Sequence, residues 1–437
     1  MAIDVKMSKE VLVYAPKMNE KVATWGVYAL PRLWREKGGE LVVRFNGEED
    51  CADTDRMFVL PNLFFRSFDE GESWEIVENG EEIYDISVWT GINPPYLTLK
   101  NGKKIAVKSK KGCKSIKGIP CKAEFIPPNK EGIVRVYEYK DIPEECKGIF
   151  LEIVEPNGDI SQTPINYDFP ERGVHVNAQA LVENITVPVF KPVEELIQPY
   201  IFKSPYFSGL TELPDGTLLA VCGGQNPSVT DRFCTDVYLV ESLDGGVTWK
   251  KRATIADGND GCVPFGYGGD GHELSLTRAE NGDLLCVMRM EMSVCEEGVE
   301  PPMFDAMLSI SSDNGYTWSQ PKAVADSSVT PHVIALKDGI VVMIYGRPGV
   351  HFKVSQNNGK TWSESYSIIG KTLEEELKAG RSLGDIKYFD TSSYSNTFVE
   401  KVSDDTVIVL YNDMKYDDGT GRPTKAGLVK KITVKKV

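Results

Sequence analysis

Residues 242–249 read SLDGGVTW, an S-x-D-x-G-x-T-W octapeptide that decides the fold of this chain. The pattern returns three times with small changes. The further copies are SSDNGYTW at 311–318, SQNNGKTW at 355–362 and SFDEGESW at 67–74. Four of the seven tryptophans lie in these octapeptides, so the repetition is more than an accident of composition.

The octapeptide has the chemistry of a tight turn between two strands. An Asp or Asn close to a Gly favours hairpin turns, because the glycine reaches positive φ without steric cost. The Ser and Asp side chains can bond the main chain of the turn, and the Trp can pack the turn onto the next strand. Each copy follows a strand-like run, which reads NLFFR, DVYLVE, AMLSI or HFKV. We therefore expect the same turn four times in one repeated unit.

Hairpin patterns define the rest of that unit. Segments such as YFSGLTELPDGTLLAVC and HELSLTRAENGDLLCVMR alternate apolar residues around a DG or NG turn, which predicts an antiparallel hairpin. Six hairpin-led units begin near residues 29, 95, 206, 272, 331 and 394. Six small sheets repeated in this way predict an all-β fold, a six-bladed β-propeller.

A single propeller is expected to occupy the whole chain, residues 1–437. The second unit is longer than the others, so about residues 100–200 are expected to form an enlarged blade or a small β insertion. The segment KEVLVYA at 9–15 has the alternation needed to complete the last blade, which would remove an exposed sheet edge. LEEELKAGRSL at 373–383 is expected to be a short helical insertion.

The composition excludes several classes of function. With 64 acidic and 49 basic side chains the net charge is -15, so we expect no binding to nucleic acid or to an anionic membrane. Nine scattered cysteines and four histidines predict no metal site, and no cofactor is expected. No secretory signal pattern is visible in the sequence, which favours a cytoplasmic location. The sequence does not determine the oligomeric state.

The four octapeptides resemble the Asp-boxes of the sialidase (neuraminidase) superfamily. The resemblance covers most of the chain except about residues 100–200. Asp-boxes are specific for the fold and only weakly specific for function, because in that family they lie on the propeller rim, away from the active site. Candidate site residues must therefore be found in other segments.

The strongest such segment is HELSLTRAENGDLLCVMR at 272–289. It is similar to the sialidase pattern of a glutamate on one strand, a D/N-G turn, and an arginine that ends the next strand. The turn is expected to bring Glu273 and Arg289 to the same end of the hairpin. The resemblance implies that Glu273 is a catalytic base and that Arg289 binds the substrate carboxylate. The alternative is an exposed Glu and a capping Arg.

Two later segments add candidates to the site. Tyr394 in TSSYSNTF resembles the nucleophilic tyrosine of sialidases, and Asp413 is the nearest substitute for the family's acid that orients an arginine. Arg347 in YGRPG lies at a strand end and is the candidate for a further arginine of the carboxylate-binding triad. The alternatives are a half-buried strand tyrosine for Tyr394 and a surface turn contact for Arg347.

The first unit departs from the family. Sialidases usually begin with an arginine two residues before a proline, and this chain has Ala29 at that place. Arg32, three residues later, or Arg44 from the adjacent strand could substitute. The family's catalytic acid lies on the loop after the second strand, where FNGEEDCADTDRM offers Asp50 and Asp53. A solvated acidic loop is the alternative for both aspartates.

The resemblance implies a retaining exo-glycosidase that hydrolyses a terminal α-linked sialic acid or a related nonulosonic acid. Its partner would be a sialylated or other acidic-sugar glycan. Guanidinium groups bind the sugar carboxylate through paired bonds. A neutral phenol avoids the repulsion that a carboxylate nucleophile would meet, although it needs a base. Two alternatives stay open: an exo-arabinanase-like propeller glycosidase with two carboxylates, and a non-catalytic glycan-binding propeller.

Overall fold

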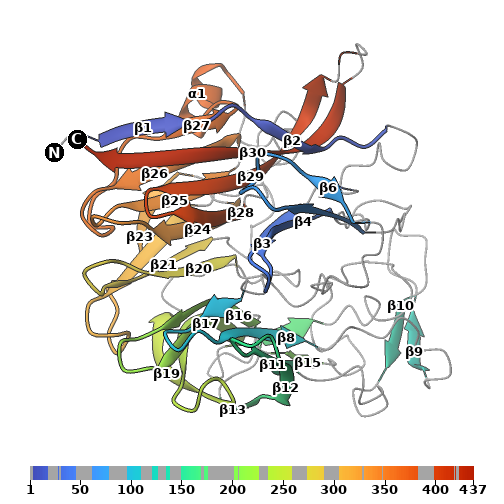
Figure 1. Ribbon diagram of the computed structural model, residues 1–437, viewed down its shortest axis with the longest axis vertical. Helices are drawn as coiled ribbons and strands as arrows, with labels where there is room; N and C mark the ends of the chain where they lie inside the picture. The colour runs from blue at the N-terminus through green and yellow to red at the C-terminus, as the bar shows by residue number, and fades with distance from the viewer. Residues whose placement is uncertain are drawn as a thin grey trace.

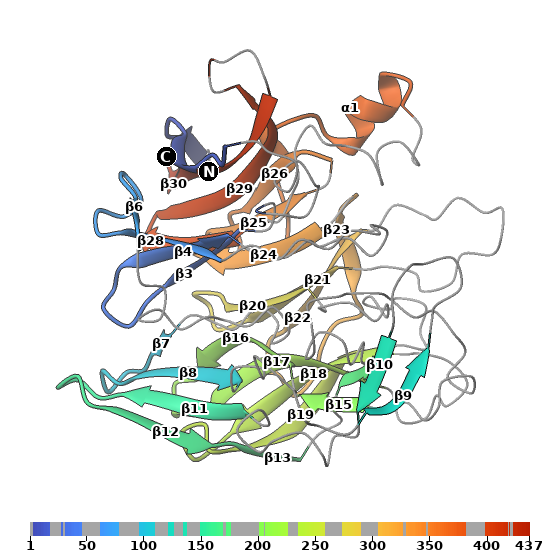
Figure 2. The same cartoon turned by 90° about the vertical axis from the view of Figure 1, so that its right-hand side faces the viewer.

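The computed structural model of the chain describes most of its strands and their turns. The described residues are 3–17, 28, 31–45, 62–77, 96–109, 121–125, 134–137, 149–168, 172–175, 201–204, 206–225, 235–257, 273–289, 305–326, 329–346, 348–381, 398–417, 419 and 423–437. The strands gather into small sheets that follow one another around the molecule (Figures 1 and 2).

Six of these sheets are the blades of a β-propeller, so the predicted fold is confirmed. Blade 1 contains β3 (Arg32–Arg35), β4 (Leu41–Phe45), β5 (Leu63–Ser67) and β6 (Glu75–Ile76). Blade 2 contains β7 (Leu97–Thr98), β8 (Lys104–Ser109), β11 (Ile149–Val154) and β12 (Ile160–Pro164). Blade 3 contains β16 (Tyr206–Glu212), β17 (Leu218–Gln225), β18 (Thr235–Ser242) and β19 (Thr248–Ala256).

The remaining blades continue the same antiparallel order. Blade 4 contains β20 (Leu274–Arg278), β21 (Leu284–Arg289), β22 (Ala306–Ser311) and β23 (Lys322–Ala325). Blade 5 contains β24 (Val329–Ala335), β25 (Val341–Gly346), β26 (Val350–Ser355) and β27 (Tyr366–Ile369). Blade 6 contains β28 (Phe398–Ser403), β29 (Thr406–Asp417) and β30 (Pro423–Lys436). The blades therefore begin within a few residues of the six positions predicted from the hairpin patterns.

The N-terminal segment closes the last blade. β2 (Val11–Tyr14) pairs with β30 as predicted, and β1 (Ile3–Met7) extends the pairing along the same strand, so the closure is longer than expected. Figure 1 shows blue β1 beside red β30, with the two chain ends close together. The main-chain N–H of Ser8 donates to the carbonyl of Lys431 at the junction of the two short strands. Both ends of the chain are thereby held in one sheet.

The four octapeptides join the third and fourth strands of blades 1, 3, 4 and 5, and they share one hydrogen-bond pattern. In blade 4, Ser311 Oγ donates to Asp313 Oδ1 at 2.8 Å and accepts from the N–H of Gly315 at 2.8 Å. Thr317 donates to Asp313 through its main-chain N–H at 2.9 Å and through its hydroxyl at 2.6 Å. These bonds onto its carboxylate lower the pKa of Asp313 to about 2.

The glycine of each octapeptide lies against the preceding blade. Gly71, Gly246, Gly315 and Gly359 all have positive φ. A Cβ atom added at Gly315 would overlap Leu239 of blade 3, and one at Gly359 would overlap Leu285 of blade 4. The turns therefore pin neighbouring blades together as well as closing their own hairpins.

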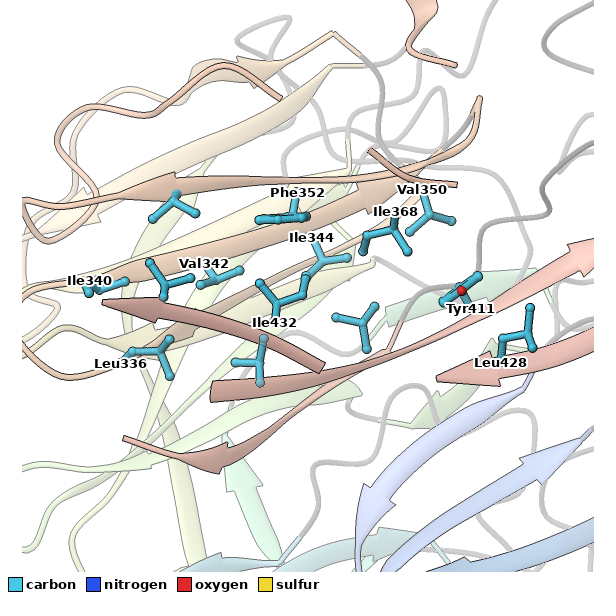
Figure 3. Packing of buried hydrophobic residues seen from close by; sticks show 14 of the residues in the cluster. Leu336, Ile340, Val342, Ile344, Val350, Phe352, Ile368, Tyr411, Leu428 and Ile432 are labelled. Atoms are coloured by element: carbon cyan, nitrogen blue, oxygen red, sulfur yellow. The ribbon is translucent and has the colours of Figure 1, made fainter. Parts of the chain in front are cut away.

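Hydrophobic side chains fill the spaces between blades. Blades 5 and 6 share one such core, in which Val342, Ile344 and Phe352 face Tyr411 and Ile432 (Figure 3). A second core joins blade 6 to blade 1 through residues that include Phe45, Phe65 and Ile408. The cores hold each blade against its neighbours, which fixes how the strand ends are arranged.

The long second unit contains an inserted hairpin. β9 (Cys121–Phe125) pairs with β10 (Val134–Tyr137) between the second and third strands of blade 2. β13 (Asn166–Asp168) then joins blade 3 in parallel with β19, and β14 (Arg172–His175) pairs with β15 (Ile201–Ser204). These elements lie in the segment expected to be an insertion or an enlarged blade.

The helical insertion is shorter than predicted. Helix α1 (Leu373–Lys378) begins at a capping box in which Thr372 and Glu375 bond each other's main-chain N–H groups. It ends before Gly380, whose φ of +85° leaves the right-handed helical region, so the predicted extension toward residue 383 was wrong for residues 379–381. Among the described residues, no helix is long and apolar enough to span a membrane.

Candidate functional site

One end of every blade is formed by the start of its first strand and the end of its second strand. In blade 4, β20 and β21 pair with Leu274 opposite Met288, and the N–H of Arg289 donates to the carbonyl of Glu273 at 3.1 Å. Glu273 and Arg289 therefore lie directly across from each other at this end, as the hairpin pattern predicted.

The two side chains form an ion pair. Nη1 of Arg289 lies 3.0 Å from each carboxylate oxygen of Glu273. Both side chains are mostly buried, with 16% of Arg289 and 18% of Glu273 exposed. Because a mostly buried pair is screened less by salt than a surface pair, the guanidinium fixes the carboxylate firmly.

Glu273 also contacts the next blade. Its Oε2 accepts a hydrogen bond of 2.6 Å from the main-chain N–H of Thr330, near the start of β24. Sequence reasoning missed Thr330, because a main-chain donor has no signature in the sequence. The carboxylate is thus held by a side chain of its own hairpin and by the backbone of blade 5.

The two candidate arginines of blade 1 lie side by side. Arg32 and Arg44 are paired across β3 and β4, so their side chains are on the same face of the blade. Leu33 and Val43, on the opposite face, belong to the core shared with blade 6. Arg44 is 1% exposed and Arg32 is partly exposed, and both make further interactions.

Asp413 lies in β29 of blade 6. It accepts a hydrogen bond of 2.8 Å from the N–H of Lys415, and burial raises the pKa of its carboxyl group. The nearby Tyr411 hydroxyl donates to Glu10 Oε2 at 3.2 Å, and burial raises the pKa of this phenol as well. Among the described residues, the hydrogen bond that we observe for Asp413 is the one from the main chain of Lys415. The resemblance implied an arginine partner instead.

Four predicted site residues lie outside the described residues: Tyr394, Arg347, Asp50 and Asp53. In the chain, the two aspartates come after β4, Arg347 directly follows β25, and Tyr394 precedes β28. Their roles stay predictions. A search of the described residues finds no group of three or more His, Cys, Asp or Glu side chains that could hold a metal ion.

Comparison with known proteins agrees with this architecture. A family described as a BNR repeat-like domain matches residues 199–414, a span that contains three of the octapeptides together with Glu273 and Arg289. Residues 199–414 therefore form a BNR repeat-like domain within a chain that folds as a six-bladed propeller.

Several solved structures resemble the chain at low identity. A protein of unknown function from Dyadobacter fermentans DSM 18053 is 16% identical over 99% of both chains, with a TM-score of 0.52. A mutant of the NanB sialidase from Streptococcus pneumoniae is 11% identical over 95% of this chain and 70% of its own, with a TM-score of 0.46. A Penicillium chrysogenum α-L-arabinanase is 11% identical over 97% and 98%, with a TM-score of 0.47. The first likeness shows the fold alone, and the other two carry no argument about activity.

This BNR-repeat propeller therefore presents a fixed carboxylate and a fixed guanidinium at one end of blade 4. A carboxylate in this setting can accept a proton, and a guanidinium can bind a planar anion through two parallel bonds. The chemistry available to the described pair is thus proton transfer beside an anion-binding group.

Proposed function

We propose that the protein is a retaining exo-glycosidase that hydrolyses a terminal α-linked sialic acid or a related nonulosonic acid. The observation that carries the proposal is the Arg289–Glu273 ion pair at the end of the blade 4 hairpin. The propeller fold and the family match support a glycan-binding site, and the residues define the chemistry.

Anion recognition is assigned to arginines. Arg289 would bind the sugar carboxylate together with Arg347 and one of Arg32 or Arg44. Planar guanidinium groups match a carboxylate with two parallel bonds, which an ammonium cannot reproduce. In a chain with a net charge of -15, such a cluster is needed to make the local potential favourable for an anionic sugar.

We assign nucleophilic attack to Tyr394 and the accompanying proton transfer to Glu273. The phenol oxygen of Tyr394 attacks the anomeric carbon while Glu273 accepts the phenol proton. The bond to the leaving oxygen breaks, and Asp50 or Asp53 protonates that oxygen. Water then attacks the anomeric carbon and gives a proton to the same aspartate, now a carboxylate, while the glycosyl–tyrosine bond breaks. Glu273 returns its proton to the phenoxide, so the product retains the anomeric configuration.

The proposal is tested by following the hydrolysis of an aryl α-sialoside by proton NMR. We expect the α-anomer of the free sugar to appear first. Glu273→Gln should lower kcat by about 100-fold or more, because the base is lost. Glu280→Gln changes an exposed glutamate on the turn of the same hairpin and should leave kcat unchanged.

Two results would contradict the proposal. Turnover of an aryl α-arabinofuranoside without turnover of the sialoside would favour the two-carboxylate class of propeller glycosidase. No turnover of either substrate, together with binding of a sialylated glycan, would favour a non-catalytic binding propeller.

A further inference from the structure

Thr330 has an unusual backbone conformation. Its φ is +46°, in the left-handed region, although it is β-branched and 5% exposed. It also precedes Pro331, which further restricts its backbone. Among the described residues, the other non-glycine residues with positive φ lie in turns, whereas Thr330 lies within a strand. Strain of this kind persists only where the surrounding structure imposes it, and it is concentrated at functional sites.

The strain is explained by how blades 4 and 5 meet. Alternate side chains of β20 accept hydrogen bonds from main-chain N–H groups of β24. Ser275 Oγ accepts from Val333 at 3.1 Å, and Thr277 Oγ1 accepts from Ala335 at 3.2 Å, with a separation of 58 residues in each case. At the same separation, the partner of Glu273 would be residue 331.

Residue 331 is a proline and has no N–H to donate. The donor to Glu273 is instead Thr330, at a separation of 57 residues. The register of β24 against β25 shifts by one residue between Val329 and His332, which is a β-bulge. The bulge and the left-handed conformation together bring the N–H of Thr330 to the place where Pro331 cannot supply one.

This contact determines how Glu273 presents its two oxygens. Oε2 accepts from Thr330 at 2.6 Å and from Arg289 at 3.0 Å. Within the described part of the chain, Oε1 accepts from Arg289 alone, also at 3.0 Å. A carboxylate held at one oxygen from the neighbouring blade cannot rotate freely, so Oε1 keeps more of its accepting capacity than Oε2.

We propose that Thr330 is a positioning residue, whose strained main-chain N–H fixes Glu273 Oε2 and leaves Oε1 to accept the proton in the reaction. The inference rests on the proposed function for the reaction itself. The fixing of Glu273 by Thr330 can be measured without any substrate.

The test replaces one N–H at a time. The α-hydroxy acid analogue of valine, placed at position 330 of the full chain by nonsense suppression, turns the peptide N–H into an ester oxygen. Its reference is Thr330→Val, which keeps the N–H and the β-branch and loses only the hydroxyl. The same analogue at position 333 is the matched control, because it removes the bond to Ser275 between the same two strands.

The first measurement is the urea midpoint of unfolding in wild-type and Glu273→Ala backgrounds. The ester at 330 should lower the midpoint in the wild-type background and have little effect when Glu273 is absent. The ester at 333 should lower the midpoint equally in both backgrounds. An equal effect of the ester at 330 with and without Glu273 would overturn the proposal, whatever reaction the protein catalyses.

The second measurement is kinetics on the aryl α-sialoside. The ester at 330 should lower kcat by about 10- to 100-fold with KM changed by less than about twofold, because the base is misplaced while the substrate is still bound. The acid limb of the pH–rate profile should move to higher pH. The ester at 333 should leave kcat within about twofold of wild type. A wild-type kcat for the ester at 330 would overturn the positioning role. If the wild type hydrolyses no glycoside, the proposed function fails, and the urea midpoints still decide whether Thr330 fixes Glu273.

Discussion

Glu273 is held from two blades, and this arrangement has consequences for its partner Arg289. The guanidinium fixes the carboxylate within the hairpin, and the N–H of Thr330 fixes it against blade 5. Because an arginine that pairs with Glu273 must also bind the substrate anion in the proposed reaction, changes at Arg289 should affect both binding and catalysis.

Arg289→Ala should weaken binding of an anionic sugar by about 2–4 kcal/mol, because the anion loses a desolvated charged partner. Arg289→Lys should restore little, since the planar fork is lost. Titration calorimetry with a sialic acid ligand measures the change. Arg278→Ala is the control, because Arg278 lies at the other end of β20. Wild-type affinity in Arg289→Ala would remove this residue from the site.

The sequence was sufficient to place Glu273 opposite Arg289, because a hairpin with a defined turn determines which residues face each other. It was not sufficient to find Thr330. Its role depends on a β-bulge and on a hydrogen bond to the adjacent blade, and neither has a pattern along one strand. Arg32 and Arg44 show an intermediate case: their pairing follows from the hairpin, but their burial depends on how blade 1 packs.

The octapeptide turns repeat one set of bonds with one informative variation. In blade 5, Asn357 accepts from the N–H of Thr361 through Oδ1 and donates to the Thr361 hydroxyl through Nδ2. In blade 4, the carboxylate of Asp313 accepts both bonds. An amide can therefore replace the carboxylate because the threonine hydroxyl can reverse its role.

Replacing the glycine of each turn by alanine should destabilise the fold more than its positive φ alone implies. Gly315→Ala should lower the free energy of unfolding by about 2–4 kcal/mol, because the new methyl group overlaps Leu239 and φ is +89°. Gly245→Ala is the control, since φ is +75° and a Cβ there meets no atom within 4 Å, so its cost should be near 1 kcal/mol. Urea unfolding measures both. Equal losses would show that contact with the neighbouring blade is unimportant.

Strand β28 carries a carboxyl group whose titration should be visible in the stability of the fold. Burial raises the pKa of Glu400 to about 7 from a usual value of 4.5, although the charge of Arg35 opposes the shift. The folded state therefore holds this proton more tightly than the unfolded chain. The stabilisation is complete below about pH 4.5 and is lost as the pH rises through 7.

Glu400→Gln should remove this pH dependence. Relative to the wild type, the variant should gain roughly 2 kcal/mol between pH 5 and pH 8. Thermal unfolding across that range measures the difference, with Glu280→Gln as the exposed control. A constant difference between wild type and Glu400→Gln at all pH values would show that Glu400 does not titrate in this window.

The ring as a whole is closed by pairing between the two ends of the chain. β1 and β2 together cover most of the length of β30, and Val13 is buried in the core between blades 6 and 1. The order of the six blades was predictable because each unit carries its own hairpin pattern. The elements between blades 2 and 3 were not predictable, since β13 joins a strand that lies about 80 residues away in the sequence, a pairing that depends on tertiary packing.

Removal of residues 1–18 should therefore lower the melting temperature by roughly 5 °C or more, because the edge of β30 becomes exposed and part of the core is opened. Leu12→Ser in the full chain is the control, since the Leu12 side chain is exposed. Calorimetry measures both proteins. A truncated chain as stable as the full chain would show that the N-terminal strands do not close the ring.

The most direct test of the proposed function is covalent trapping with a 2,3-difluoro sialic acid. After incubation, intact mass should increase by one glycosyl unit, and peptide mapping should place the label on Tyr394. Tyr394→Phe should abolish labelling, and Tyr411→Phe, in β29 of blade 6, should retain it. A label on a carboxylate, or no label on a protein that still binds the sugar, would contradict a tyrosine nucleophile assisted by Glu273.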